Sequence, residues 1–293
     1  MENGKVPGTC SSLCYGLFYR NQSSIRVSLY LQTKVKSERV LLLKNLKLYV
    51  ALLMVCVLLL PVSVYGKNHP RHYYEEQGTA IWDVPISSKY IAITFDDGPS
   101  PKYTPEILDI LEEYDARATF FVVGSRAQEN PSIIKSMVED GHELANHSYH
   151  HPDFTGISKQ DLISEMDNTA AVLENLTGVP PKLFRPPGGV YNDIIVNTAN
   201  EEGYMVVMWS WHQDTRDWKS PGVHKIVSTV LNNTRNGDIV LFHDYGGDRS
   251  QTVKALEQIL PKLKEEGYEF VTVSELMQKH SKYNLLHGVN GVK

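Results

Sequence analysis

Two histidines four positions apart stand in a segment that could bind a metal ion. In the segment HSYHH (147–151), a helical or turn-like backbone would turn His147 and His151 to the same side. Three histidines within five residues more often indicate a metal site than a buried structural histidine, because neutral imidazole is a common ligand of zinc and other transition metals.

A pair of adjacent carboxylates forms a second polar cluster. Asp96 and Asp97 stand in the segment TFDDGP (94–99). Taken alone, two aspartates before Gly-Pro are most simply a turn. Further polar clusters that could contribute are RPPGG (185–189), DTRDW (214–218) and LFHD (241–244).

Each of these five clusters directly follows a short apolar run that is typical of a β-strand. From residue 88 onward such runs occur at 90–95, 118–124, 142–148, 182–186, 204–211, 238–244 and 268–276. Helical patterns lie between most of them, starting at 104 and covering 132–140, 159–176, 193–202, 224–233 and 252–266. This alternation predicts a parallel sheet covered by helices, either an open doubly wound sheet or a barrel. In both folds the catalytic groups lie at the carboxyl ends of the strands, so the five clusters predict a single active site.

In order and spacing, the clusters resemble the five motifs of the polysaccharide deacetylase family, also called carbohydrate esterase family 4 or the NodB-homology domain. The first motif of that family, TFDDGP, is matched at 94–99, and the second, H(S/T)xxH, at 147–151. The fourth and fifth are matched at 217–218 and 241–243. The resemblance covers about residues 87–280. It implies an α/β fold, a distorted (β/α) barrel of about seven parallel strands, that hydrolyses N-acetyl groups on sugars.

The resemblance also implies a metal site and a base. One divalent metal ion would be bound by Asp97, His147 and His151. Two imidazoles and one carboxylate suit zinc, which we expect, and the same ligands accept cobalt, nickel and iron(II). Asp96 is implied to be the general base that takes the proton from water, and Arg185 is implied to orient and tune it.

A general acid and a substrate pocket follow from the same resemblance. His243 is implied to protonate the departing amine, and Asp217 to orient His243 and raise its pKa. Leu241 and Trp218 are implied to form an apolar pocket for the acetyl methyl group. The third motif departs from the family pattern, because Gly188 replaces the aromatic residue that usually follows RxP. Gly188 keeps the backbone N–H that holds the oxyanion, but it removes an aromatic wall of the sugar site.

The N-terminal part of the chain contains an apolar run that predicts a membrane segment. Residues 48–66 carry no charge, and at about 1.5 Å per residue they span roughly 28 Å, close to the ~30 Å hydrocarbon core. The preceding residues 34–47 carry five basic side chains against one acidic one, so the positive-inside rule predicts a cytoplasmic N-terminus and an exported remainder. We expect a single-pass anchor in the cell membrane. Cleavage of this segment as a signal peptide, with secretion of the rest, stays open.

These patterns divide the chain into five segments. They are a basic cytoplasmic tail, or an artefact of an upstream start codon (1–47), the anchor (48–66), a polar tether (67–88), the deacetylase domain (89–280) and a C-terminal tail (281–293). The 29 Lys and Arg against 34 Asp and Glu give a net charge of −5, which argues against a nucleic-acid partner. No cysteine follows Cys56, so the predicted domain folds without disulfides and has no thiol nucleophile. We expect this catalytic domain to be monomeric.

The expected substrate is an acetylated glycan, with the N-acetylglucosamine units of peptidoglycan as the first choice. Chitin oligomers, poly-N-acetylglucosamine and O-acetylated xylan stay open within the same class. Two readings from other classes are a catalytically silent glycan-binding module and a membrane scaffold with a cytoplasmic partner. A silent module would be expected to lose a ligand, the base or the acid, whereas all of these are present: Asp96, Asp97, His147, His151 and His243.

Overall fold

The apolar runs of the sequence form the strands of one parallel sheet. The computed structural model describes residues 14–58 and 67–283, and the chain divides into two units, Met1–Val64 and Tyr65–Lys293. In the second unit the strands run in the order β1-β6-β5-β4-β3-β2-β7, with β8 paired to β2, and every pair is parallel. The strands are β1 (Ala80–Ile81), β2 (Tyr90–Asp96), β3 (Ala118–Val122), β4 (Glu143–Asn146), β5 (Leu183–Phe184), β6 (Met205–Val207), β7 (Ile239–His243) and β8 (Glu269–Phe270).

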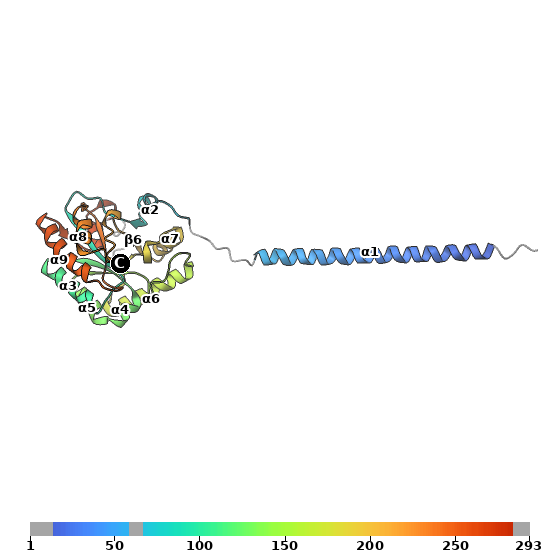
Figure 1. The fold of residues 1–293 in the computed structure, drawn as a ribbon, viewed down its shortest axis with the longest axis horizontal. Coiled ribbons are helices and arrows are strands. Elements are labelled where there is room, and N and C mark those ends of the chain that lie inside the picture. Colours follow the sequence, from blue (N-terminus) through green and yellow to red (C-terminus); the bar gives the residue numbers. More distant parts are fainter. Residues whose placement is uncertain (1–13, 59–66, 284–293) are drawn as a thin grey trace, which may run out of the picture. The chain divides into compact units, whose positions relative to one another are not determined.

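Helices surround this sheet. Figure 1 shows them at the periphery of the second unit, with the strands in its interior. Within the described residues no ladder joins β1 to β7, so the barrel is incomplete. This arrangement confirms the predicted α/β fold with its path of seven parallel strands. The helices are α2 (Arg71–Gln77), α3 (Tyr103–Glu113), α4 (Gly124–Glu129), α5 (Pro131–Glu139), α6 (Lys159–Thr177), α7 (Asp193–Glu201), α8 (Val223–Leu231), α9 (Ser250–Glu265) and α10 (Val273–Gln278).

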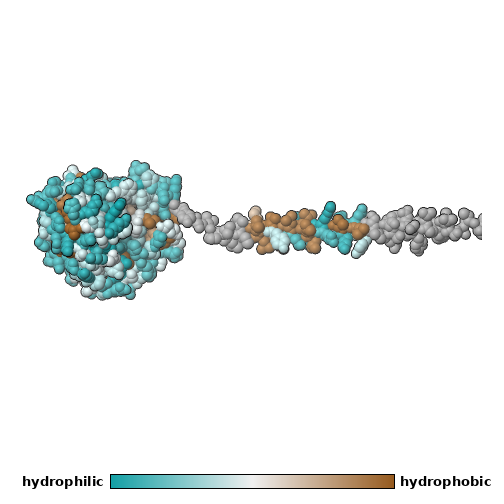
Figure 2. Space-filling model, in the orientation of Figure 1, coloured by the Kyte–Doolittle hydropathy of each residue, from teal (hydrophilic) through white to brown (hydrophobic). Residues whose placement is uncertain are grey.

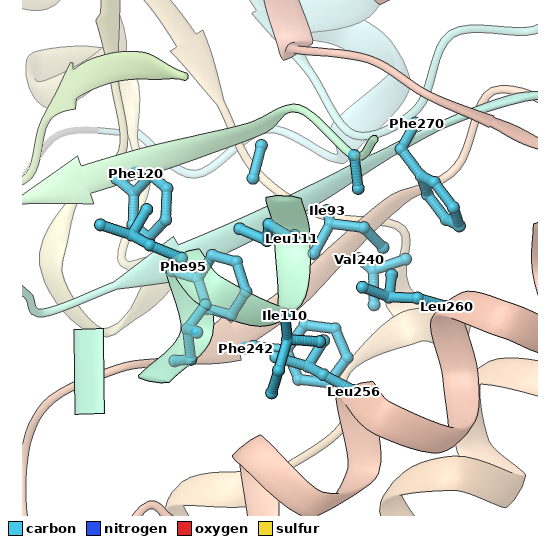
Figure 3. Close-up of a cluster of buried hydrophobic side chains, with 14 of the residues drawn as sticks. Ile93, Phe95, Ile110, Leu111, Phe120, Val240, Phe242, Leu256, Leu260 and Phe270 are labelled. Carbon is cyan, nitrogen blue, oxygen red and sulfur yellow. The ribbon is translucent and has the colours of Figure 1, made fainter. Parts of the chain in front are cut away.

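The largest core cluster lies between the sheet and the helices α3 and α9. Phe95 of β2 stacks against Phe120 of β3 and Phe242 of β7, with ring centroids 5.0 and 5.8 Å apart. Figure 3 shows these rings beside Ile110 and Leu256, which come from the two helices. Because β2 is buried along almost its whole length, it reads as a continuous apolar run, as is typical of a strand covered on both faces.

The register of the sheet brings the polar strand ends to one edge. Asp96, the last residue of β2, lies opposite His243, the last residue of β7. On the other side of β2, Val122 of β3 lies opposite Asn146 of β4, which in turn lies opposite Phe184 of β5. The residues that follow these strands therefore meet above the same edge, as the sequence predicts.

Two local predictions differ from the structure. Residues 71–81, predicted as part of a polar tether, form α2 and β1 and pack into the core, where Tyr74 and Trp82 are buried. The predicted strand 268–276 is a strand only at 269–270, because Thr272 and Glu275 form a capping box that starts α10.

Three short 3₁₀ turns and one helix start also matter for the site. The turn η1 (Pro187–Gly189) follows β5. The turn η2 (Trp211–Gln213) follows β6, and η3 (Asp217–Lys219) precedes α8. The first helical pattern is predicted to start at 104, and α3 begins one residue earlier, at Tyr103. Thr104 donates a hydrogen bond to Asp244.

The first unit contains α1 (Cys14–Leu58). Figure 2 shows apolar side chains along this helix, and large exposed apolar residues run from Val40 to Met54. A search of the described residues finds no helix with both the length and the hydropathy needed to cross a membrane. Residues 59–66 of the predicted membrane segment, and most of the predicted C-terminal tail, lie outside the described residues. Membrane anchoring therefore stays a prediction.

Candidate active site

An unusual backbone conformation places both adjacent aspartates in one pocket. In a regular strand, successive side chains point to opposite faces of the sheet. Asp97, however, has a φ of 76°, in the left-handed region that non-glycine residues rarely adopt. Arg126 donates a hydrogen bond to the carbonyl of Asp97 at 2.5 Å and so stabilises this turn. As a result, Asp96 and Asp97 both line the pocket at the end of β2.

The two predicted histidine ligands lie beside Asp97. His147 follows β4, and its Nδ1 is 2.7 Å from the carbonyl oxygen of Arg185. Since a carbonyl only accepts, Nδ1 carries the proton, and Nε2 keeps its lone pair for a ligand. That Nε2 is 3.5 Å from Oδ1 of Asp97, and Nε2 of His151 is 3.1 Å from the same oxygen.

These three side chains fit a divalent metal ion. Their donor atoms all lie within 4.8 Å of one another, and they are the one such group found within the described ranges 14–58 and 67–283. Ligands at about 2.0–2.1 Å from a tetrahedral ion lie about 3.3 Å apart, close to the two distances measured to Asp97. His150, the remaining histidine of the segment, is turned away, with Nδ1 2.8 Å from Glu165.

Electrostatics keep the carboxylate of this group ionised. Burial raises the pKa of Asp97, but the two adjacent imidazoles of His147 and His151 outweigh burial, so its pKa lies well below the ordinary range. The hydrogen bond from His151 to Asp97 raises the pKa of His151, although burial opposes this. An anionic ligand between two imidazoles is the donor set that a cation requires.

Arg185 lies fully buried behind the site and holds Asp96. Its NH1 donates to Oδ1 of Asp96 at 2.6 Å and to Oγ1 of Thr94 at 2.9 Å. Its other nitrogens donate to two backbone carbonyls at the end of β6, at 3.0 and 2.8 Å. The backbone carbonyl of Arg185 also accepts a hydrogen bond from Nδ1–H of His147. Arg185 therefore positions both the predicted base, Asp96, and one predicted ligand, His147.

A second pair, the partly buried His243 and the buried Asp217, forms the opposite side of the site. Nδ1 of His243 is 2.7 Å from Oδ1 of Asp217. The other oxygen of Asp217 accepts from the backbone N–H of His243 at 2.9 Å and from Thr252 at 2.7 Å. Burial lowers the pKa of His243, but the hydrogen bond and charge of Asp217, together with the charges of Asp96 and Asp97, raise it to about 9. Protonated His243 can therefore serve as an acid at neutral pH.

The predicted site residues surround one pocket of about 570 Å³. Leu241 lines it as a buried residue of β7, whereas Trp218 is 51% exposed at its rim. Arg185 and Asp217 do not line the pocket and instead hold the residues that do. The predicted residues that line it are Asp96, Asp97, His147, His151, Gly188, Trp218, Leu241 and His243.

Further residues of this pocket were not assigned from the sequence. Trp209 falls within the apolar run 204–211, where an aromatic residue cannot be told from a core residue. Arg249 is buried and donates only to backbone carbonyls, which gives no sequence pattern. Asp214 also lines the pocket. The only sequence signal for this position was its membership of the polar cluster after β6. Gly189 and Gly246 complete the lining.

Three comparisons with known proteins agree with this geometry. A family model described as polysaccharide deacetylase matches residues 83–207. A peptidoglycan-N-acetylglucosamine deacetylase of Bacillus cereus is 51% identical over 211 residues, which cover 72% of this chain and 99% of the relative. A crystal structure of a peptidoglycan N-acetylglucosamine deacetylase in complex with 4-naphthalen-1-yl-N-oxidanyl-benzamide superposes with a TM-score of 0.68. It is 34% identical and covers 71% of this chain and 97% of that chain.

One similar structure is of a protein described as a pseudoenzyme. It is a family pseudoenzyme from Bacillus anthracis, with a TM-score of 0.63 and 31% identity over 69% of each chain. The fold alone therefore does not decide whether a protein with this arrangement is active. That decision depends on the side chains in the pocket.

Proposed function

The chain belongs to the polysaccharide deacetylase family, and we propose that it is a metal-dependent enzyme that removes acetyl groups from the N-acetylglucosamine units of peptidoglycan. The observation that carries this proposal is the position of Asp97, His147 and His151 between a buried base, Asp96, and a partly buried acid, His243. The substrate is proposed from the similarity to the Bacillus cereus enzyme, which extends over 99% of that protein.

The proposed metal ion is zinc, held by Asp97, His147 and His151. A divalent cation at this position supplies a Lewis acid that polarises the acetyl carbonyl and lowers the pKa of water from 15.7 towards about 7. Cobalt, nickel and iron(II) fit the same two imidazoles and one carboxylate, so the metal is identified only by experiment.

The residues of the chain perform the proton transfers. Asp96, fixed through Oδ1 by Arg185, takes the proton of the attacking water. The backbone N–H of Gly188 donates to the developing oxyanion, and one such donor contributes about 100- to 1000-fold in rate. His243 donates its proton to the departing amine, and Asp217 stabilises the charged imidazole. Leu241 and Trp218 exclude water from the acetyl methyl group.

Acetate release from purified peptidoglycan and from an N-acetylglucosamine oligomer tests this proposal. We expect activity with zinc or cobalt that is lost with a chelator. Asp96→Ala should retain the metal and lose about 100-fold or more of the rate, since a positioned base contributes about 10²–10⁴-fold. Asp97→Ala should lose both metal and activity. Asp109→Ala, which alters an exposed aspartate of α3, is the matched control and should behave as the wild type.

The outcomes separate the alternatives. Acetate released faster from chitin oligomers, poly-N-acetylglucosamine or O-acetylated xylan than from peptidoglycan would replace the proposed substrate. A chain that holds metal and binds glycan but releases no acetate would be a silent binding module, like the pseudoenzyme that it resembles.

We also propose that residues 48–66 anchor the protein in the cell membrane, with the catalytic unit outside. The uncharged run, its basic flank and the exposed apolar side chains of α1 support this proposal. The full chain should sediment with membranes and be released by detergent but not by high salt. A mature protein in the medium whose N-terminus follows residue 66 would instead establish secretion after cleavage. A cellular function that is lost on deletion of the tail (1–47) but kept in a catalytically inactive variant would favour the alternative of a membrane scaffold.

A further inference from the structure

One wall of the pocket is formed by backbone alone. Gly188 and Gly189 both line the pocket, in the turn η1. Gly188 has a φ of 64°, and a β-carbon built on it would meet no atom closer than Cγ2 of Val190, at 4.0 Å. Position 188 therefore faces open space where the resemblance leads us to expect an aromatic side chain. A sugar ring bound there would have no apolar face to pack against unless another residue supplies one.

Trp209 lies directly against this turn. A β-carbon on Gly189 would lie 2.5 Å from Cη2 and 3.1 Å from Cζ3 of the Trp209 ring. The far end of the indole thus occupies the space that any side chain at position 189 would need. The indole of Trp209 can lie this close to the turn only because residue 189 has no side chain.

One side of the Trp209 indole packs against the protein core, and another side lines the pocket. Its neighbours Met208 and Ser210 are buried, whereas Trp209 is only partly buried and lines the pocket. Its ring packs against two core clusters and has the guanidinium of Arg185 5.9 Å from its centroid. A rigid, partly exposed indole offers a large apolar contact area at a low cost in conformational entropy.

We infer that Trp209 is the specificity-determining wall of the sugar site and packs against the ring of the N-acetylated sugar in place of the missing aromatic residue at position 188. This inference rests on the proposed function and deepens it. Trp218 lines the same pocket from η3, which lies with Trp209 in the segment between β6 and β7, so the acetyl group and the ring of the sugar would each be contacted by an indole of this segment.

Binding of an N-acetylglucosamine tetramer to the full chain tests this inference. Calorimetry in the Asp96→Ala background avoids consumption of the tetramer. Trp209→Ala should weaken binding by about tenfold or more, and Trp209→Phe by no more than about threefold, because phenylalanine keeps an aromatic face. Trp211→Ala is the matched control, since Trp211 is 62% exposed and does not line the pocket. Its affinity should equal that of the parent chain.

Zinc binding and kinetics distinguish a sugar contact from a structural role. Trp209→Ala should bind zinc as the parent chain does, and in the active background it should raise KM with little change in kcat. Equal tetramer affinity in the parent and in Trp209→Ala would overturn the inference. So would a parallel loss of zinc and tetramer binding, or no tetramer binding by the parent. If the Asp96→Ala chain binds the tetramer through Trp209 but the wild type releases no acetate, Trp209 is still a sugar contact, and only the proposed reaction is refuted.

Discussion

At the scale of single residues, Asp244 shows how burial sets the charge of a side chain next to the site. It follows His243 and is completely buried, and it forms no ion pair within the described residues. Thr104 donates to its Oδ2 at 2.5 Å, whereas Oδ1 has no hydrogen-bond partner in the part of the chain that the structure describes. Burial raises the pKa of Asp244 to about 7; the hydrogen bond from Thr104 opposes this rise, and the charge of Asp97 adds to it.

This raised pKa predicts a pH dependence of stability. Between about pH 4 and 7 the folded protein keeps the proton of Asp244 while the unfolded chain releases it, so the free energy of unfolding falls as the pH rises through this window. The loss is on the order of a few kcal/mol and is complete above about pH 7. Asp244→Asn, which is neutral throughout, should remove this slope in urea unfolding of metal-free protein at pH 5 and pH 8. Asp248→Asn, at an exposed residue whose pKa is about 2, should keep it. An unchanged slope in Asp244→Asn would contradict a protonated Asp244.

The pair of His243 and Asp217 predicts a pH dependence of activity. The acid must be protonated, so kcat should fall as the pH rises through the pKa of His243, about 9 without the metal and lower when a cation offsets the charge of Asp97. Asp217→Asn removes the main charge that raises this pKa, and the alkaline limb should move down by about one unit or more. Thr252→Val removes only one hydrogen bond to Asp217 and should cause a smaller shift. An identical limb in Asp217→Asn and the wild type would mean that another group protonates the amine.

At the scale of elements, the short turns after the strands determine the shape of the site. The strands fix only where each turn begins. The turn η1 presents Gly188 and Gly189 because both have a positive φ, 64° and 67°, which glycine adopts without strain. At Gly189 a second constraint is added, because the ring of Trp209 leaves no room for a β-carbon. Conformation and packing thus both require glycine at this position.

The comparison of Gly189→Ala with Gly178→Ala separates these two constraints. Gly178 ends α6 with a φ of 78° and has no atom within 4 Å of a built β-carbon. Gly178→Ala should therefore cost only about 1–2 kcal/mol of backbone strain and leave kcat/KM unchanged. Gly189→Ala should cost more and lower kcat/KM for the N-acetylglucosamine tetramer, because the alanine displaces Trp209. Urea unfolding and steady-state kinetics of both variants check this, and equal effects of the two substitutions would argue against the packing constraint.

At the scale of the whole molecule, the segment before β2 is part of the second unit and not a simple tether. β1 pairs with β6, with Ala80 opposite Val206, and Trp82 is fully buried beyond the end of β1. β6 in turn ends at the carbonyls that hold Arg185, and Trp209 follows it. The segment 71–82 therefore stabilises the strand on which one side of the active site depends.

Two truncations of the chain test this role. A chain that starts at residue 67 should unfold cooperatively and deacetylate soluble oligomers, because it keeps α2 and β1. A chain that starts at residue 84 loses Tyr74 and Trp82 and should be less stable by about 5 kcal/mol or more, since deletion of one large buried side chain costs about 3–5 kcal/mol. Urea unfolding of both proteins measures the difference. Equal stability of the two would mean that the segment is a dispensable tether.

The sequence by itself determined which polar residues meet at one edge of the sheet. Apolar runs alternate with helical patterns, and parallel strands must place their carboxyl ends at one edge, so His147, Asp96 and His243 could be assigned to one site without any coordinates. The resemblance to the polysaccharide deacetylase family, which rests on clusters at those same strand ends, implied a distorted barrel and a deacetylase. The membrane segment, the identity of the metal and the exact polymer stay predictions.

Only the tertiary structure decided which residues stand behind and around the reacting groups. Trp209 and Arg249 reach the pocket through contacts between distant parts of the chain, and no local pattern distinguishes them from core residues. The packing of Trp82 and the capping of α10 by Thr272 likewise overrode the polar and strand-like patterns of their segments. Local periodicity indicates which face of a helix or strand is apolar. The contacts between elements depend instead on how the whole sheet curves.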